Sequence, residues 1–414
     1  MKKELQNNIR TIYMMGFLLG FIVVVPIYVP LLQSHGLSMS EVLQTQALFA
    51  LTIALFEVPS GYIADIWGRR NAILLGAGLN AIGFFSLLWA DSFVDFLVYE
   101  AILGVGFSLI SGADLALLYD TEVYLQEQGL DGGAGAGKSL SRLISLEAAA
   151  SGAAGVVASL LLMRSLDSVV LVQAIVGFAP AILGLGLVEV PRITSQVPES
   201  GGHAANARRI LGILLFGRPV VLWTAAAIAV FGLFAVYVFW VYQKYWEMQG
   251  IPLEWFGYIW AAFALTASLA ARYSGALERY FGTRLLLVMI AVLPLGGLLG
   301  MAFGAGWFGV FCGFAIQISR GLSMTLFYEA LNRRVPGEFR ATVNSLVSLA
   351  VRSVFIVTGP LLGMALDSQG MQPTLLALVA IFAPLMVVVL VPLVLRIRSE
   401  RAENLSVPAA RNAT

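Results

Sequence analysis

The sequence predicts an all-α membrane protein whose twelve transmembrane helices form two pseudo-symmetric six-helix bundles around a central cavity. Three observations lead to this fold class: the composition, the number of long apolar stretches, and a repeat that relates the two halves of the chain. Of the 414 residues, 59% are hydrophobic and only 12% are charged. This leaves too little polar surface for a water-soluble globular protein, so the chain is predicted to cross a membrane many times.

Apolar stretches set the number of spans. A helix needs about twenty mainly apolar residues to cross the hydrocarbon core. Roughly twelve such stretches occur, at residues 11–33, 42–66, 71–90, 95–119, 140–163, 169–189, 220–245, 254–276, 284–304, 307–331, 342–366 and 373–395. The first is too long for a signal-peptide core and lacks a clear small-residue cleavage site, so we expect it to be retained.

The basic residues predict the orientation. Arginine and lysine gather at alternate connections and at the termini, and the opposite connections carry little beyond Arg164 and Lys244. Since such residues favour the cytoplasmic side, both termini are expected in the cytoplasm. We predict a multi-pass protein of the inner (plasma) membrane.

A long polar connection divides the chain. It runs from Pro191 to Arg218, after the sixth span, and contains Pro, Ser, Gly, His and Arg, a composition typical of a linker. The predicted organisation is an N-terminal bundle at 1–190, a cytoplasmic linker at 191–218, a C-terminal bundle at 219–398 and a cytoplasmic tail at 399–414.

The connection between the second and third spans combines residue types with separate physical roles. Gly61 permits close approach of a neighbouring helix, and Gly68 can adopt the positive φ of a tight turn. Asp65 lies where a helix leaves the hydrocarbon, and Arg69 and Arg70 stay in the cytoplasm. This pattern, Gly-x-x-x-Asp-x-x-Gly-Arg-Arg, resembles the signature loop of the major facilitator superfamily of secondary transporters.

The second half of the chain repeats these features. The end of the eighth span carries Gly275, Arg279, Gly282 and Arg284 at the corresponding spacing. Glu329, which closes the tenth span, answers Asp120, which closes the fourth. Because each echo falls at the same place in its half, we expect two related six-helix bundles, as in a transporter that rocks between two states.

The loop between the second and third spans is a candidate gate. Asp65, Arg69 and Asp120 are expected at one membrane face, where a carboxylate can pair with the loop arginine. The resemblance implies that this network holds the two halves together in the outward-facing state. The alternative is an ordinary cytoplasmic loop whose surface ion pairs each contribute little.

Polar groups inside the spans are the candidates for binding protons or substrate, because charge in hydrocarbon is costly and usually functional. They are Glu57, Glu100, Asp114, Arg142, Glu147, Gln243, Arg320 and Arg352. Either the acids and bases pair permanently, or the acids take up protons while arginines contact an anionic or polar group of the substrate. Gln243 belongs to an aromatic cluster at 239–246, interpreted as an interfacial belt or as part of an outer gate.

Two features limit the functional interpretation. Glu100 stands where many proton-driven exporters of the superfamily have an arginine early in the fourth span, which argues against their standard antiport mechanism. Residues 132–139 have the spacing of a phosphate-binding loop, but no strand precedes them and no segment suits a nucleotide-binding domain. We therefore expect a flexible loop and no nucleotide.

The predicted function is secondary active transport of a small organic solute by alternating access, favoured as proton-coupled efflux of drug-like or amphiphilic compounds. The alternatives are uptake of an anionic or zwitterionic metabolite, by symport or facilitated transport, and a non-transporting sensor or scaffold. We expect no enzymatic activity, no metal site and no cofactor, with the proton as coupling ion. The expected partners are the solute and the lipid bilayer, without nucleic acid, and the protein is predicted to be a monomer.

Overall fold

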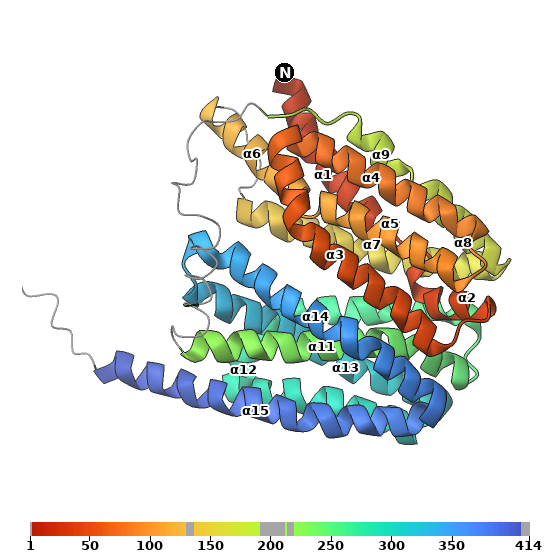
Figure 1. The fold of residues 1–414 in the computed structure, drawn as a ribbon. Helices are drawn as coiled ribbons and strands as arrows, with labels where there is room; N and C mark the ends of the chain where they lie inside the picture. The colour runs from red at the N-terminus through yellow and green to blue at the C-terminus, as the bar shows by residue number, and fades with distance from the viewer. Residues whose placement is uncertain (1, 130–135, 191–211, 213–218, 407–414) are drawn as a thin grey trace, which may run out of the picture. The chain divides into compact units, whose positions relative to one another are not determined.

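The computed structural model describes residues 2–129, 136–190, 212 and 219–406, and these ranges contain helices and connections but no strand (Figure 1). The predicted linker, apart from Gly212, and the end of the predicted tail lie outside the described residues, as does most of the predicted glycine-rich loop; Lys138 and Ser139 already belong to a helix. In the first half the helices are α1 (Lys2–Gly20), α2 (Tyr28–Ser34), α3 (Met39–Trp67), α4 (Arg69–Ser86), α5 (Phe93–Ile110), α6 (Ala113–Glu127), α7 (Ala136–Leu162), α8 (Leu166–Val176) and α9 (Ala179–Gly184). In the second half they are α11 (Pro219–Met248), α12 (Phe256–Phe303), α13 (Gly306–Arg334), α14 (Arg340–Gln369) and α15 (Met371–Ser406).

Eleven segments of the described chain are long and apolar enough to cross a membrane. One of them, Leu253–Phe303, has 51 residues. A helix of that length would extend about 77 Å, more than twice the roughly 30 Å of the hydrocarbon core. Gly282 interrupts it with φ 77° and ψ 152°, so the segment supplies two spans, the predicted eighth and ninth, and the total is twelve.

The backbone at Gly282 closely matches the backbone at Gly68. Gly68, between α3 and α4, has φ 94° and ψ 149°, a conformation that is readily accessible only to glycine. The two glycines occupy equivalent positions in the sequence repeat, so the repeat extends to the conformation of the chain at both turns.

The chain divides into two compact units. Unit 1 contains Met1–Val197, Phe239–Leu265 and Arg352–Gln369, and unit 2 contains Pro198–Val238, Thr266–Val351 and Gly370–Thr414. Unit 1 thus combines the first six spans with parts of α11, α12 and α14. The predicted bundle boundaries at residues 190 and 219 remain a prediction.

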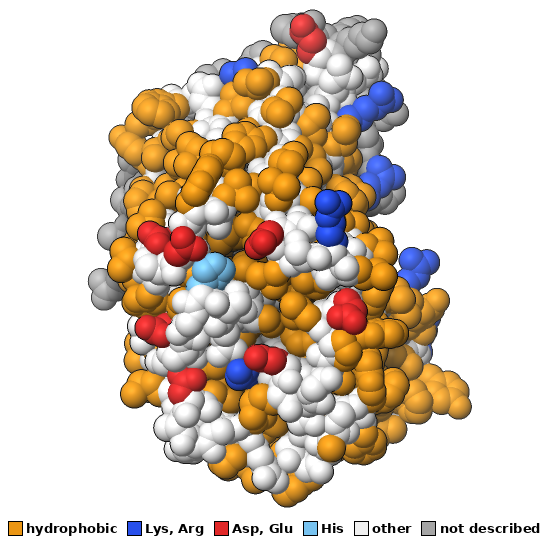
Figure 2. Space-filling view, turned by 90° about the vertical axis from the view of Figure 1, so that its right-hand side faces the viewer, with side chains coloured by type: hydrophobic (Ala, Val, Ile, Leu, Met, Phe, Trp, Pro, Cys, Tyr) orange, Lys and Arg blue, Asp and Glu red, His pale blue; other side chains and the backbone are white. Residues whose placement is uncertain are grey.

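Small residues bring helices close together within unit 1. A Cβ atom added to Gly76 of α4 would lie 2.6 Å from the carbonyl oxygen of Gly106 in α5, so only glycine fits there. Such contacts are characteristic of membrane helices, whose association depends on close packing. Hydrophobic side chains also cover broad areas of the face seen in Figure 2, as expected for a protein surrounded by lipid.

The start of α3 is satisfied from two sides. Asp367 of α14 accepts hydrogen bonds from the backbone N–H groups of Met39 (3.0 Å) and Ser40 (2.8 Å). Ser38 accepts the next one, from Glu41 (3.2 Å). The first three amides of the helix, which have no partner inside the helix itself, are therefore all bound.

Candidate functional site

The loop between α3 and α4 forms a hydrogen-bonded network with a carboxylate that the sequence analysis missed. Glu189, which follows α9, accepts bonds from the backbone N–H groups of Arg69 (3.0 Å) and Arg70 (2.8 Å). It thereby caps the start of α4 with a negative charge, the sign that a helix N-terminus favours. The position of Glu189 at the end of the sixth span is the only sequence signal for this role.

The two arginine side chains connect this loop to other helices. Arg69 forms an ion pair with Asp120 of α6 and donates to the carbonyl oxygen of Ala116 (2.6 Å). Arg70 donates from Nε to the carbonyl oxygen of Leu187 (2.6 Å). The Arg69–Asp120 pair that the sequence suggested is therefore present within unit 1, whereas its role in gating remains a prediction.

Other parts of the motif differ from expectation. Among the described residues, nothing lies within 4 Å of a Cβ atom added to Gly61 or to Gly275, so neither glycine permits a close helix contact as predicted for Gly61. Asp65 lies on an exposed part of α3. Glu329 pairs with Arg333 of its own helix, unlike Asp120, which pairs between helices. Arg279 and Arg284 are exposed on either side of Gly282.

We expect the Asp120→Asn variant to transport several-fold more slowly than the wild type, with a stability change under about 1 kcal/mol. The ion pair is partly exposed, and such pairs contribute little to stability; any larger effect must come from the transport cycle. Initial transport rates and thermal unfolding of the purified protein measure the two quantities. Glu127→Gln, an exposed carboxylate on the same helix, is the matched control, and an equal loss of rate in both variants would contradict a role for the pair.

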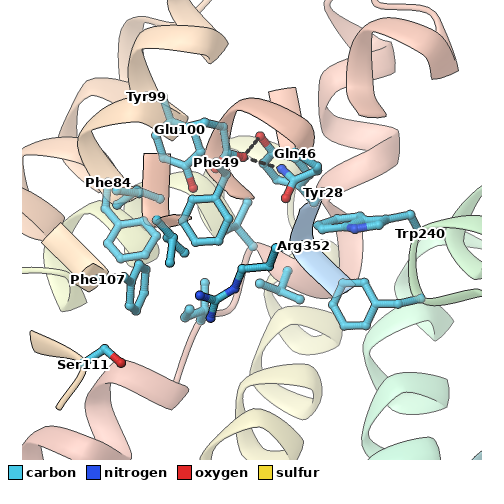
Figure 3. Close-up of a pocket in the computed structure, with 16 residues that line it drawn as sticks. Tyr28, Gln46, Phe49, Phe84, Tyr99, Glu100, Phe107, Ser111, Trp240 and Arg352 are labelled. Atoms are coloured by element: carbon cyan, nitrogen blue, oxygen red, sulfur yellow. Dashed lines mark hydrogen bonds between the residues drawn. The ribbon is translucent and has the colours of Figure 1, made fainter. Parts of the chain in front are cut away.

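A cavity of about 390 Å³ lies within unit 1 (Figure 3). Its walls are mainly apolar, with aromatic side chains from Phe49, Phe84, Tyr99, Phe107, Phe239 and Trp240. Its polar groups are few and come from Tyr28, Gln46, Glu100, Ser111 and Arg352. An apolar cavity with a small number of polar groups is the usual form of a site for a small organic molecule.

Glu100 provides the buried carboxyl of the cavity. Its side chain, only 4% exposed, accepts hydrogen bonds at one oxygen from the hydroxyl of Tyr28 in α2 and from Nε2 of Gln46 in α3. Both bonds are drawn in Figure 3. The Tyr28 ring also packs against Trp240, with 5.7 Å between ring centroids. A fixed carboxyl is thus set among aromatic rings, which suits binding of a proton or of a positively charged group.

Arg352 forms an ion pair with one of the predicted acids. Its Nη1 lies 3.1 Å from Oε2 of Glu57 in α3, and Figure 3 shows its side chain extending into the cavity. The two side chains are 33% and 36% exposed. Of the two explanations that the sequence left open, pairing is therefore realised for Glu57 and Arg352 in this structure.

Gln243 stabilises an interruption in the first span. Its amide donates to the carbonyl oxygen of Val25 (2.9 Å) and accepts from the N–H of Val29 (2.9 Å). These backbone groups flank the break that precedes α2, where in a membrane no water can replace a missing partner. The interpretation of residues 239–246 as an interfacial belt was wrong for Tyr245 and Trp246, which are 0% exposed, because this segment packs inside unit 1.

We expect the Gln243→Leu variant to lose about 2 kcal/mol of stability, because one buried C=O and one buried N–H would lose their partners. Thermal unfolding in detergent, followed by circular dichroism, measures the loss. Gln126→Leu, at an exposed position of α6, is the matched control. Equal unfolding temperatures for the two variants would show that Gln243 has no such structural role.

The other predicted binding residues do not line this cavity. Asp114, in the first turn of α6, accepts the N–H of Leu115 (2.7 Å) and lies near enough to Glu147 of α7 for the two carboxyls to interact electrostatically. Arg142 is exposed on α7. Arg320, on α13 of unit 2, is exposed and donates to Gln317 (3.2 Å). The expectation that Arg320 and Arg352 serve one site receives no support from the described contacts.

Three cavity residues were missed by the sequence analysis. Gln46 carried a signal, because it is a polar side chain inside an apolar span. Tyr28 and Trp240 carried none, since aromatic residues are common throughout such a chain. Among the described residues no group of three His, Cys, Asp or Glu side chains is arranged to bind a metal ion.

Comparison with known proteins identifies the family. A model described as the Major Facilitator Superfamily matches residues 11–360, whereas no curated protein sequence matches the chain. The solved structure of the nucleoside transporter NupG is similar, with a TM-score of 0.72 and 13% identity over 94% of this chain and 99% of that chain. A D-xylose–proton symporter has a TM-score of 0.72 and 14% identity over 92% and 96% of the respective chains.

The peptide transporter POT is also similar, with a TM-score of 0.71 and 14% identity over 94% of each chain. At these identities the likeness to solved structures shows the fold and says nothing of the solute. The predicted fold class, twelve membrane helices in the two-bundle arrangement of this superfamily, is confirmed. The chain therefore belongs to the Major Facilitator Superfamily and is a membrane transporter, not an enzyme.

Proposed function

We propose that the protein exports amphiphilic organic compounds in exchange for protons and that the cavity in unit 1 binds them. The observation that carries this proposal is the Glu100 carboxyl, bonded to Tyr28 and Gln46 within aromatic walls. Aromatic rings favour a flat apolar body, and a buried carboxyl can carry a proton in one half of the cycle and face a cationic group in the other. The same proposal places the protein in the inner membrane as a monomer with both termini in the cytoplasm.

Arg352 is the observation that favours a second candidate, uptake of an anionic or zwitterionic metabolite. Its side chain extends into the cavity, where a guanidinium can bind a carboxylate or phosphate. We rank this candidate second because Glu57 offsets the charge of Arg352. Arg320, the other predicted anion-binding residue, is not among the residues that line the cavity.

The test uses inverted membrane vesicles that contain the protein and are energised to acidify the lumen. A pH-sensitive dye reports proton release as cationic, neutral and anionic aromatic compounds are added in turn. Export predicts release with cationic or neutral amphiphiles and none in vesicles without the protein. Release confined to anionic compounds would favour the second candidate, and no release with any compound would contradict proton-coupled export.

A further inference from the structure

Unit 2 carries an apolar groove of about 430 Å³, formed by the part of α12 that follows Gly282 and by the end of α15. The α12 side contributes Leu287 and Ala291, and the α15 side contributes Leu390 and Val391. Arg284 is the one charged residue that lines it. The groove therefore has apolar walls along its length and a single cation.

The cation lies at one end of the groove. The lining residues extend from Arg284 to Val292 on α12 and from Met386 to Leu395 on α15, a length of about 12–14 Å at 1.5 Å per residue. Arg284 begins just past the turn at Gly282, which is predicted to face the cytoplasm. The groove thus extends from the predicted cytoplasmic boundary through roughly the depth of one leaflet, half of the ~30 Å hydrocarbon core.

The groove opens to the outside of the protein. Val288 is 54% exposed and Val391 is 51% exposed, and both line it. A water molecule takes up about 30 Å³, and a methylene group is of similar size, so the groove holds on the order of a dozen methylenes. An α-helix from a second copy of the chain, about 10–12 Å across with its side chains, is too wide for it.

Arg284 makes no hydrogen bond or ion pair with any other described residue, and its side chain is exposed. A cation without a partner at the membrane boundary attracts the anionic lipids of the cytoplasmic leaflet. A guanidinium is well matched to a phosphate group, which it can bind through two parallel hydrogen bonds. The charge and the groove together match the head and one chain of a lipid.

We propose that this groove binds an anionic phospholipid of the cytoplasmic leaflet, with one acyl chain along Leu287, Ala291 and Leu390 and the phosphate on Arg284. A negatively charged head group is favoured because a zwitterionic one brings its own cation next to the guanidinium. The site is independent of the transported solute and of the direction of transport.

The experiment is native mass spectrometry of the purified full-length protein titrated with phosphatidylglycerol, or with phosphatidylcholine of the same chains. Arg284→Gln is expected to weaken phosphatidylglycerol binding about five-fold, the effect of one basic residue near an anionic surface. Arg279→Gln, exposed beside the same turn but outside the groove, is the matched control and should bind normally. Equal binding by the two variants would overturn the proposal.

Two further arms test the lipid chain. Ala291→Phe places a ring inside the groove without altering charge, and it should weaken phosphatidylglycerol binding as well. Glycerol 3-phosphate, which has the phosphate and no acyl chain, should not compete with the lipid. Undiminished binding by the Ala291→Phe variant, full competition by glycerol 3-phosphate, or equal affinity of the wild type for phosphatidylcholine would each reject the site.

Discussion

The Glu100→Gln variant is expected to lose proton-driven transport, by at least ten-fold, while still exchanging solute between the two sides of the membrane. Glutamine has the size of glutamate and keeps an oxygen that accepts from Tyr28 and Gln46, so the cavity stays intact. It cannot take up and release a proton in the relevant pH range. Solute binding and movement should therefore persist while coupling to the proton gradient is lost.

Two assays on the same vesicles separate these effects. The first measures solute accumulation driven by a proton gradient, and the second measures exchange of labelled for unlabelled solute with no gradient. Glu254→Gln makes the same chemical change at an exposed position outside the cavity and should behave as wild type in both. Full accumulation by Glu100→Gln would remove Glu100 as the coupling residue, and loss of both activities would instead indicate a role in solute binding.

The second large effect is expected at the Glu57–Arg352 pair. Neutralising either partner alone, by Glu57→Gln or Arg352→Gln, leaves one uncompensated charge beside an apolar cavity. Each single variant should therefore transport at least ten-fold more slowly. The loss of stability should be modest, on the order of 1 kcal/mol, because both side chains are about one-third exposed to solvent.

The double variant provides the decisive comparison. When both residues are glutamine no unpaired charge remains, so its stability should exceed that of either single variant. A double-mutant cycle on the thermal unfolding of the four proteins gives the coupling between the two side chains. Strictly additive effects would mean that the ion pair contributes nothing, and a single variant that is more stable than the double one would rule out an uncompensated charge as the cause of the loss.

The spans and the turns followed from the sequence because each depends on nearby residues. Apolar length alone predicts a membrane helix, and Gly68 and Gly282 announce their turns through a conformation that few other residues adopt. The Arg69–Asp120 pair was also accessible, since positive-inside loops and span ends place both side chains at one face.

The cavity was only partly predictable, because its residues come together from distant parts of the chain. Glu100 and Arg352 were noticed as costly charges in apolar spans. Their surroundings were not, since nothing in the sequence places Tyr28 next to Glu100, or Gln243 on the break before α2. Exposed positions such as Arg142 and Arg320 look the same in sequence as buried ones, because the direction of a side chain on a helix depends on which neighbours that helix has.

The contact of Asp367 with the start of α3 has an evolutionary consequence. The two donors are main-chain N–H groups of Met39 and Ser40, which every residue except proline provides. Most substitutions in α3 therefore leave the contact in place, whereas nearly any change at position 367 removes it. Drift in these two helices should be unequal, with a wide choice of residues tolerated at 39 and 40 and a narrow one at 367.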